Sequence, residues 1–225
     1  MDVKQHIACW LNANDGEGVD SLFVAQKEKT KDIKFKEILG RGYAIEHYLD
    51  SDTILFLGMN PSYDEKVPGD SNKPFYPEFG HCYYSRIKGI TTAVNKALGT
   101  SFPFAHHDLY FVRNTSQKEV IAMKMAMPDF FEKQLRISKS IIEASKPKII
   151  VVANAGASKI FMTEMYNLAF GTLEDRDQNL GAHFIKVGDS RIPVLFTGMI
   201  SGQRALDEGS YNTLIWHICH ILRSI

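Results

Sequence analysis

The chain has little cysteine, and its few cysteines are not paired. Cys9, Cys82 and Cys219 stand far apart without a C-x-x-C pattern, which indicates neither a disulfide framework nor a zinc site. The longest apolar run, residues 149–153, is far too short to cross a bilayer, and the first residues lack the apolar stretch of a secretory signal. These absences predict a cytoplasmic, intracellular protein that has no membrane partner.

A net charge of either sign is also lacking, because 26 basic and 26 acidic residues balance to zero. Proteins that coat nucleic acid use Lys and Arg to displace counterions from phosphates, so this balance argues against non-specific coating. It is compatible with an enzyme that makes few phosphate contacts at one cleft. The lysine excess in residues 27–41 favours a solvated helix face over a nucleic-acid patch.

The rest of the composition is that of an ordinary globular protein, with 44% apolar and 23% charged residues. No internal repeat, low-complexity tract or linker divides the chain. We therefore expect a single domain over residues 1–225, in which residues 1–50 form a helical N-terminal extension.

Four apolar segments have the continuous pattern of strands buried on both faces of a sheet: residues 53–58, 108–112, 148–152 and 191–197. Residues 183–187 fit an antiparallel partner for the last of them. Helical patterns separate the strands, at residues 84–98, from 128 to about 145, from 154 onward and after 209–210. The alternation predicts an α/β fold, a three-layer sandwich with a mainly parallel four-stranded central sheet.

Ligands of such sheets bind outside the carboxyl ends of the strands. Chemistry is therefore expected in the segments that follow the predicted strands, which are residues 58–62, 113–117, 153–157 and 198–204.

The segment after the first strand reads Gly58-Met59-Asn60-Pro61-Ser62. It resembles the first motif of the mismatch-specific and single-strand-selective branches of the uracil-DNA glycosylase superfamily, which use Gly-x-Asn-Pro where other branches use Asp-Pro. Further segments resemble the family in the same order along the chain, from about residue 54 to residue 224. They are residues 79–84, which resemble a segment lining the base pocket, Asn114 after the second strand, residues 147–152, and residues 199–204 at the position of the second motif.

The resemblance implies a uracil-DNA glycosylase-like fold and the excision of uracil or a related damaged base by hydrolysis of the N-glycosidic bond. It also implies single-stranded or mismatched DNA as partner, no cofactor and no metal, and we expect a monomer. By resemblance, Asn60 and Met199 stand at the catalytic positions. The substrate-binding positions are Gly58, Met59, Pro61, Ser62, Phe79, His81, Tyr83 and Asn114, and the DNA-binding positions are Ser201, Gln203, Arg204 and Leu206.

Two of these positions depart from the family pattern. Asn60 replaces the Asp that activates water in the fastest branch, so it can orient a water but cannot take its proton. Met199 stands where the family usually has His or Asn, and losing one such donor costs on the order of a hundredfold to a thousandfold in rate. The amide of Asn114 offers both a donor and an acceptor to the uracil edge, and Phe79 is the candidate ring for stacking.

Other interpretations stay open. Asn60-Pro61 is also a common turn dipeptide, Asn114 could satisfy backbone groups at a strand end, and Phe79 could be a core residue. The chain could be a binding module that holds a nucleobase, nucleotide or nucleic acid without cutting it. It could also be an unrelated α/β enzyme that acts on a small phosphorylated ligand at the strand ends.

Overall fold

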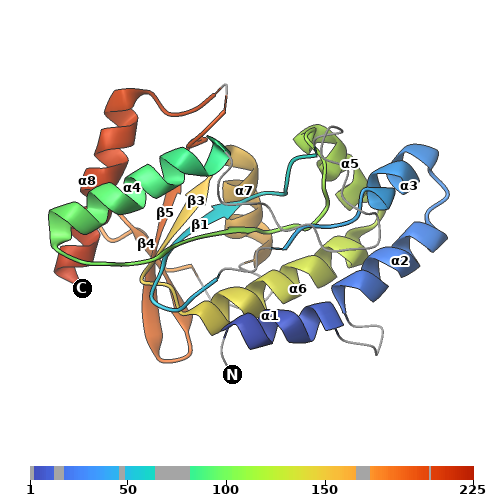
Figure 1. The fold of residues 1–225 in the computed structure, drawn as a ribbon, viewed down its shortest axis with the longest axis horizontal. Coiled ribbons are helices and arrows are strands. Elements are labelled where there is room, and N and C mark those ends of the chain that lie inside the picture. The colour runs from blue at the N-terminus through green and yellow to red at the C-terminus, as the bar shows by residue number, and fades with distance from the viewer. Residues whose placement is uncertain (1–2, 13–17, 46–48, 64–81, 166–172, 203) are drawn as a thin grey trace.

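The computed structural model describes residues 3–12, 18–45, 49–63, 82–165, 173–202 and 204–225 (Figure 1). Helices and strands alternate along these segments. In chain order they are α1 (Val3–Asn12), α2 (Val19–Lys29), α3 (Ile33–Gly40), β1 (Ile54–Gly58), α4 (Cys82–Leu98), β2 (Phe104–Asp108), α5 (Gln117–Ala126), α6 (Pro128–Ser145), β3 (Ile149–Ala153), α7 (Ala155–Ile160), the π-helical turn η1 (Phe161–Met165), β4 (His183–Val187), β5 (Ser190–Thr197) and α8 (Glu208–Ser224).

The strands form one sheet in the order β2-β1-β3-β5-β4. β2, β1, β3 and β5 run parallel, and β4 pairs antiparallel with β5. The predicted α/β class and the predicted antiparallel partner at residues 183–187 are confirmed. The predicted number of four strands is wrong, because β4 is a full member of the sheet and extends it to five. After β1 the chain adds β2 on one side and β3 on the other, so the topological switch point lies between β1 and β3.

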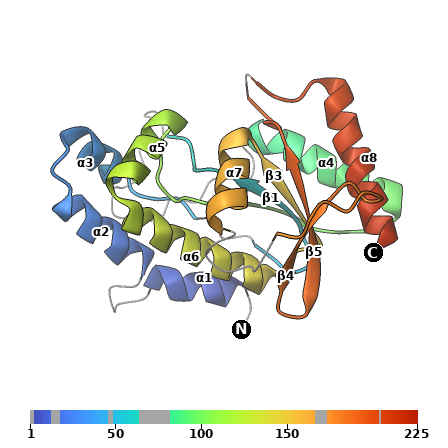
Figure 2. The ribbon, with the colours of Figure 1, turned by 180° about the vertical axis from the view of Figure 1, so that it is seen from behind.

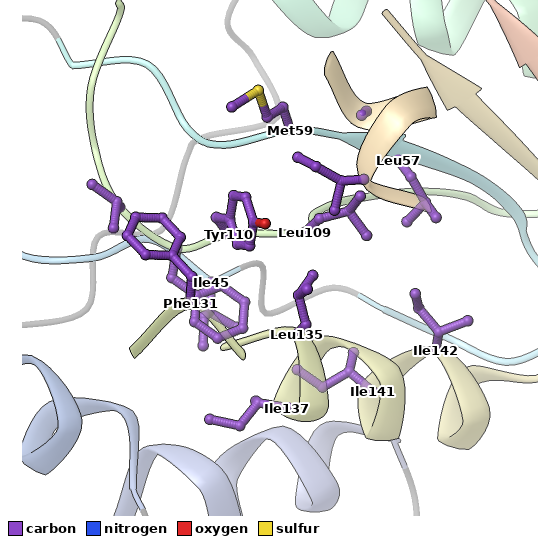
Figure 3. Packing of buried hydrophobic residues seen from close by; sticks show 14 of the residues in the cluster. Ile45, Leu57, Met59, Leu109, Tyr110, Phe131, Leu135, Ile137, Ile141 and Ile142 are labelled. Atoms are coloured by element: carbon purple, nitrogen blue, oxygen red, sulfur yellow. The ribbon is translucent and has the colours of Figure 1, made fainter. Parts of the chain in front are cut away.

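Helices cover both faces of the sheet, which makes a three-layer sandwich (Figures 1 and 2). α4 and α8 lie on one face, and α1 and α6 lie on the other. Alternate side chains of β1 supply the two cores: Phe56 packs in the α4/α8 core, and Leu57 packs in the α6 core. Figure 3 shows Leu57 above Leu135 and Ile142 of α6. Each such fully buried side chain contributes about 1.5–3 kcal/mol.

The second strand lies earlier in the chain than predicted, at residues 104–108 instead of 108–112. Two histidines interrupt the apolar pattern of this strand in the sequence. Both are buried in the structure, where His106 packs against Tyr84 of α4 and His107 contacts Ser138 Oγ of α6 at 3.1 Å. Burial lowers the pKa of His107 to about 3, so this ring is neutral at physiological pH. The apolar residues 109–112 are buried as well, but beyond the sheet, where the Ala44 N–H donates to the Phe111 carbonyl.

The described part of residues 1–50 contains three helices, α1, α2 and α3. One helix, α5, has no counterpart in the sequence prediction. The last helix, which the sequence predicts after residues 209–210, begins slightly earlier, at Glu208; its N-cap is Asp207, whose Oδ1 accepts the Ser210 N–H at 2.9 Å. Within the described segments, no helix is long and apolar enough to span a membrane.

Candidate functional site

The carboxyl edge of the sheet, at the switch point between β1 and β3, is the place where the predicted segments meet. The chain after β1 runs beside the chain after β2: the Tyr110 N–H donates to the Met59 carbonyl at 2.9 Å, and the Asn114 N–H donates to the Pro61 carbonyl at 3.0 Å. On the other side of β1, the Asn154 N–H at the end of β3 donates to the Thr197 carbonyl at the end of β5. This edge therefore brings together residues 58–63, called here the first-motif segment, and the ends of three other strands.

Asn60 is held by its amide nitrogen. Nδ2 donates to three backbone carbonyls: Pro61 at 3.0 Å, Val112 at 3.2 Å and Asn114 at 2.7 Å. Its Oδ1 is buried and accepts no hydrogen bond from any residue that the structure describes. The three donated bonds determine which way the amide faces, so Asn60 presents one fixed, uncommitted acceptor at this edge.

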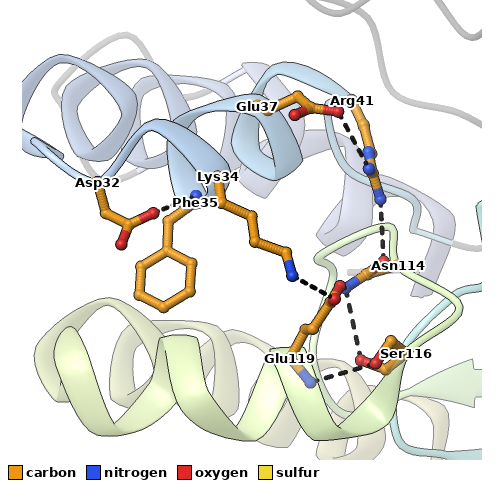
Figure 4. A network of polar contacts seen from close by, with 8 residues as sticks. All are labelled: Asp32, Lys34, Phe35, Glu37, Arg41, Asn114, Ser116 and Glu119. Carbon is orange, nitrogen blue, oxygen red and sulfur yellow. Dashed lines mark hydrogen bonds and ion pairs between the residues drawn. The ribbon is translucent and has the colours of Figure 1, made fainter.

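Asn114 joins α3 to α5 through a polar network (Figure 4). Its Oδ1 accepts from Arg41 Nη1 at 2.9 Å, and its Nδ2 donates to Glu119 Oε2 at 2.9 Å. Glu119 also pairs with Lys34 Nζ at 2.7 Å. The hydrogen bond from Asn114, followed by that from Lys34, holds the pKa of Glu119 below its usual value. Asn114 lies six residues after β2, and it would have to release one of these partners before reading the edge of a base.

Tyr63 is the last described residue of the first-motif segment. Two guanidinium groups contact its ring, with Arg41 Cζ 4.5 Å and Arg113 Cζ 5.3 Å from the ring centroid. Thr115 Oγ1 donates to the Tyr63 carbonyl at 2.8 Å. Burial lowers the pKa of Arg113. These contacts attach the segment to the chain after β2, and sequence reasoning did not identify them because they join residues far apart in the chain.

Asp108, the last residue of β2, is a candidate that sequence reasoning missed. It is paired in register with Gly58, the last residue of β1. A Cβ at position 58 would clash with Asp108 Oδ1 and would lie 3.3 Å from His106 Nε2, so a glycine is needed for the carboxyl group to lie there. Burial raises the pKa of Asp108 to about 6, against a smaller opposing effect of His106.

The turn from β3 into α7 is strained and tightly packed. Asn154 has φ 79° and ψ 155°, a conformation that is rare outside glycine, and its Oδ1 accepts the Ala157 N–H at 2.9 Å as the N-cap of α7. A Cβ at Gly156 would lie 2.7 Å from Met59 Sδ and 3.3 Å from Gln117 Oε1. Three segments therefore lie close together at this point: the first-motif segment, the start of α5 and the start of α7. Gln117 is a second candidate residue that the sequence did not single out.

Residues 199–202 and 204–206, which include predicted DNA-binding positions, form a turn next to α4. The Leu206 N–H donates to the Met199 carbonyl at 2.8 Å, and Arg86 Nη2 of α4 donates to the Leu206 carbonyl at 3.0 Å. The Leu206 side chain packs against the α4/α8 core, so it would have to leave this core to fill a gap in DNA. Ser201 Oγ is buried without a partner among the described residues, and Arg204 is exposed.

The other predicted site residues differ in exposure. Gly58 and Met59 are buried, Pro61 is half-buried, and Ser62 is exposed. Four positions fall outside what the structure describes: Phe79, His81 and Gln203 entirely, and Tyr83 in its side chain. In the described part of the chain, no group of three or more His, Cys, Asp or Glu residues could hold a metal ion.

This arrangement suits hydrolysis that is assisted by proton transfer. It combines one oriented amide acceptor, Asn60 Oδ1, with one half-buried acid, Asp108, whose pKa of about 6 is close to physiological pH. Comparison with protein-family models gives no match for this chain, and comparison with curated proteins gives no match either.

Proposed function

We propose that the protein is a DNA glycosylase that excises uracil or a related damaged base by hydrolysing the N-glycosidic bond. The observation that carries this proposal is the geometry of Asn60, whose amide nitrogen is held by three carbonyls while Oδ1 stays uncommitted. Such a group can orient a water molecule. The motif Gly58-Met59-Asn60-Pro61, which resembles that of the uracil-DNA glycosylase superfamily, supports the same assignment.

The reaction requires a base that has left the stack, because its bond to the sugar is not accessible inside a duplex. The water oxygen then bonds to the sugar C1′ while the C1′–N bond breaks and its electron pair leaves with the base. The proton of the water needs an acceptor, which an amide cannot be. We assign this role to Asp108, since it ends the strand next to β1 and is ionised above pH of about 6.

The base departs with negative charge, and the second motif is where a donor would stabilise it. Met199 supplies no donor, so we expect slow excision. Replacing it by His should raise the single-turnover rate by on the order of a hundredfold. An unchanged rate in Met199→His would contradict the assignment of residues 199–204 to the second motif.

The test uses labelled oligonucleotides that carry one uracil, either single-stranded or mismatched with guanine, followed by alkaline cleavage. The wild-type protein should produce strand breaks, and Asn60→Ala should abolish them. Asn95→Ala is the matched control, because Asn95 likewise bonds the backbone, with Nδ2 2.8 Å from the Phe102 carbonyl. No breaks with wild-type protein in excess over the DNA would overturn the proposal.

The role of Asp108 is tested by the pH dependence of the same rate. The wild-type rate should fall as pH drops through about 6, when the carboxylate becomes protonated. Asp108→Asn should be slower at neutral pH and should lose this inflection. If the pH–rate profile of Asp108→Asn matches that of the wild type, Asp108 is not the proton acceptor. The glycosylase proposal itself would not be affected by that result.

A binding module is the second candidate, and the engaged state of Asn114 favours it. Both ends of this amide are bonded within the protein, and Met199 offers no polar group. Such a protein would hold uracil-containing DNA without cutting it. Binding in a gel-shift assay together with the absence of strand breaks would select this alternative.

A further inference from the structure

A polar pocket lies away from the switch point, at the end of β5 and beside the first turns of α8. Its volume is about 370 Å³, within the range of small-molecule sites. The residues that line it with polar side chains come from the chain before β4, from β4, from β5 and from α8; they are Arg176, His183, Thr197, Ser210, Thr213 and His217.

Arg176 supplies the cation of the pocket. Its side chain is exposed, and its Nε donates to the Gly181 carbonyl at 3.0 Å. Neither of its two Nη groups donates a hydrogen bond to a described residue. A planar guanidinium with its outer nitrogens uncommitted matches the spacing of phosphate oxygens.

Two histidines complete the polar lining. His183 Nδ1 lies 3.0 Å from the Glu174 carbonyl, and His217 Nε2 lies 2.7 Å from the Leu180 carbonyl. A carbonyl only accepts, so each of these nitrogens carries the hydrogen of the neutral ring. The other nitrogen of each ring is an acceptor in the neutral ring and a donor in the imidazolium, so it can bond a phosphate hydroxyl in the first form and a phosphate oxygen in the second.

No carboxylate of a described residue lines the pocket, and two acids near it are engaged elsewhere. Asp177 Oδ1 accepts the N–H groups of Asn179 and Leu180, and Asp207 accepts from Ser210. These hydrogen bonds lower the pKa of both carboxyl groups. The other charged or titratable groups on the neighbouring elements include Glu174 with its partner Arg191, the exposed Asp175, Lys186 on β4, Asp189 in the turn before β5, and Glu208, Tyr211, Cys219, His220 and Arg223 on α8.

We propose that this pocket binds a phosphate group through Arg176, His183 and His217. The two hydroxyl groups at the start of α8 donate within the protein, Ser210 to Asp207 and Thr213 to the Gly209 carbonyl. Their oxygens can accept from hydroxyl groups of a ligand, as the neutral rings can. The chemistry therefore fits a phosphate on a hydroxyl-bearing small molecule, and it also fits a DNA phosphate.

The first test measures binding of inorganic phosphate by calorimetry and by NMR of the histidine ring nitrogens. Saturable binding with shifts at His183 and His217 is expected. Arg176→Gln should weaken it roughly tenfold or more, the loss of one charge-assisted contact. Lys186→Gln is the matched control, since it removes an exposed cation from the same strand hairpin without touching the pocket lining. No saturable binding, or equal weakening in both variants, would overturn the proposal.

The second test identifies the source of the phosphate by competition. Displacement of inorganic phosphate by ribose 5-phosphate, but not by a short oligonucleotide, assigns the pocket to small phosphorylated molecules. Displacement by the oligonucleotide, with weaker DNA binding in Arg176→Gln, assigns it to the DNA backbone. Displacement by neither means an adventitious ion only and overturns the proposal. None of these measurements depends on base excision, so the pocket and the glycosylase proposal can fail separately.

Discussion

Replacing Asp108 by Asn should stabilise the protein at neutral pH, although the change removes a charged group from a candidate site. Asp108 is half-buried at the end of β2, and removal of its carboxyl group from solvent raises its pKa from 3.8 to about 6. The folded protein therefore binds this proton more tightly than the unfolded chain does. Asparagine keeps the shape of the side chain and has no charge to bury.

The sign and the size of the effect follow from linkage. Below pH of about 4 the group is protonated in both states, so its ionisation costs no stability. Between pH of about 4 and about 6 the unfolded chain ionises this group while the folded protein still holds the proton, so the wild-type protein loses stability over this range, up to at most about 3 kcal/mol. Wild-type protein should lose this stability with rising pH, and Asp108→Asn should not.

The assay is urea unfolding of both proteins across a series of pH values. The excess stability of Asp108→Asn should be about 3 kcal/mol near pH 8 and should shrink by about 2 kcal/mol on reaching pH of about 4.5. Asp189→Asn, in the exposed turn between β4 and β5, is the control and should show no such trend. A constant difference between wild type and Asp108→Asn would refute the burial argument and, with it, the proposed proton-acceptor role.

Further predictions concern the packing around the same edge. Gly58→Ala should destabilise the protein by about 1–3 kcal/mol, because the new Cβ meets Asp108 Oδ1, and Asp108→Ala in the same chain should recover most of the loss; the absence of recovery in urea unfolding would contradict the contact. Asn114→Ala should cost about 1–3 kcal/mol and should raise the pKa of Glu119, which an NMR titration of the carboxyl group measures; an unchanged Glu119 pKa would argue against the network. Asn154→Gly should stabilise the protein by about 1 kcal/mol, since relief of the strained backbone exceeds the small loss of the cap, and a clear loss of thermal stability would show that the strain is absent.

The sequence by itself determined most of the regular structure. Residues 53–58 and 148–152 are continuous apolar runs that only a doubly covered strand can bury, and β1 and β3 lie there with every residue buried. Pro128 at the start of α6 is a local signal of the same kind, because proline fits the first turn of a helix. Such signals depend only on residues that are neighbours in the sequence, so they predict strands and helices without knowledge of the fold.

Only the tertiary structure decided where β2 lies and which polar groups meet. His106 and His107 break the apolar pattern, and their burial depends on Tyr84 and Ser138, which come from distant helices. The same holds for the contact of Asp108 with Gly58, which depends on the register of two parallel strands separated by a helix.

The partners of Asn114 and the lining of the phosphate pocket were equally unreadable from the sequence. Arg41 lies 73 residues before Asn114, and His217 lies 37 residues after Leu180. Local patterns describe which face of an element is apolar, whereas a polar site depends on distances between elements, and those distances exist only once the cores have packed.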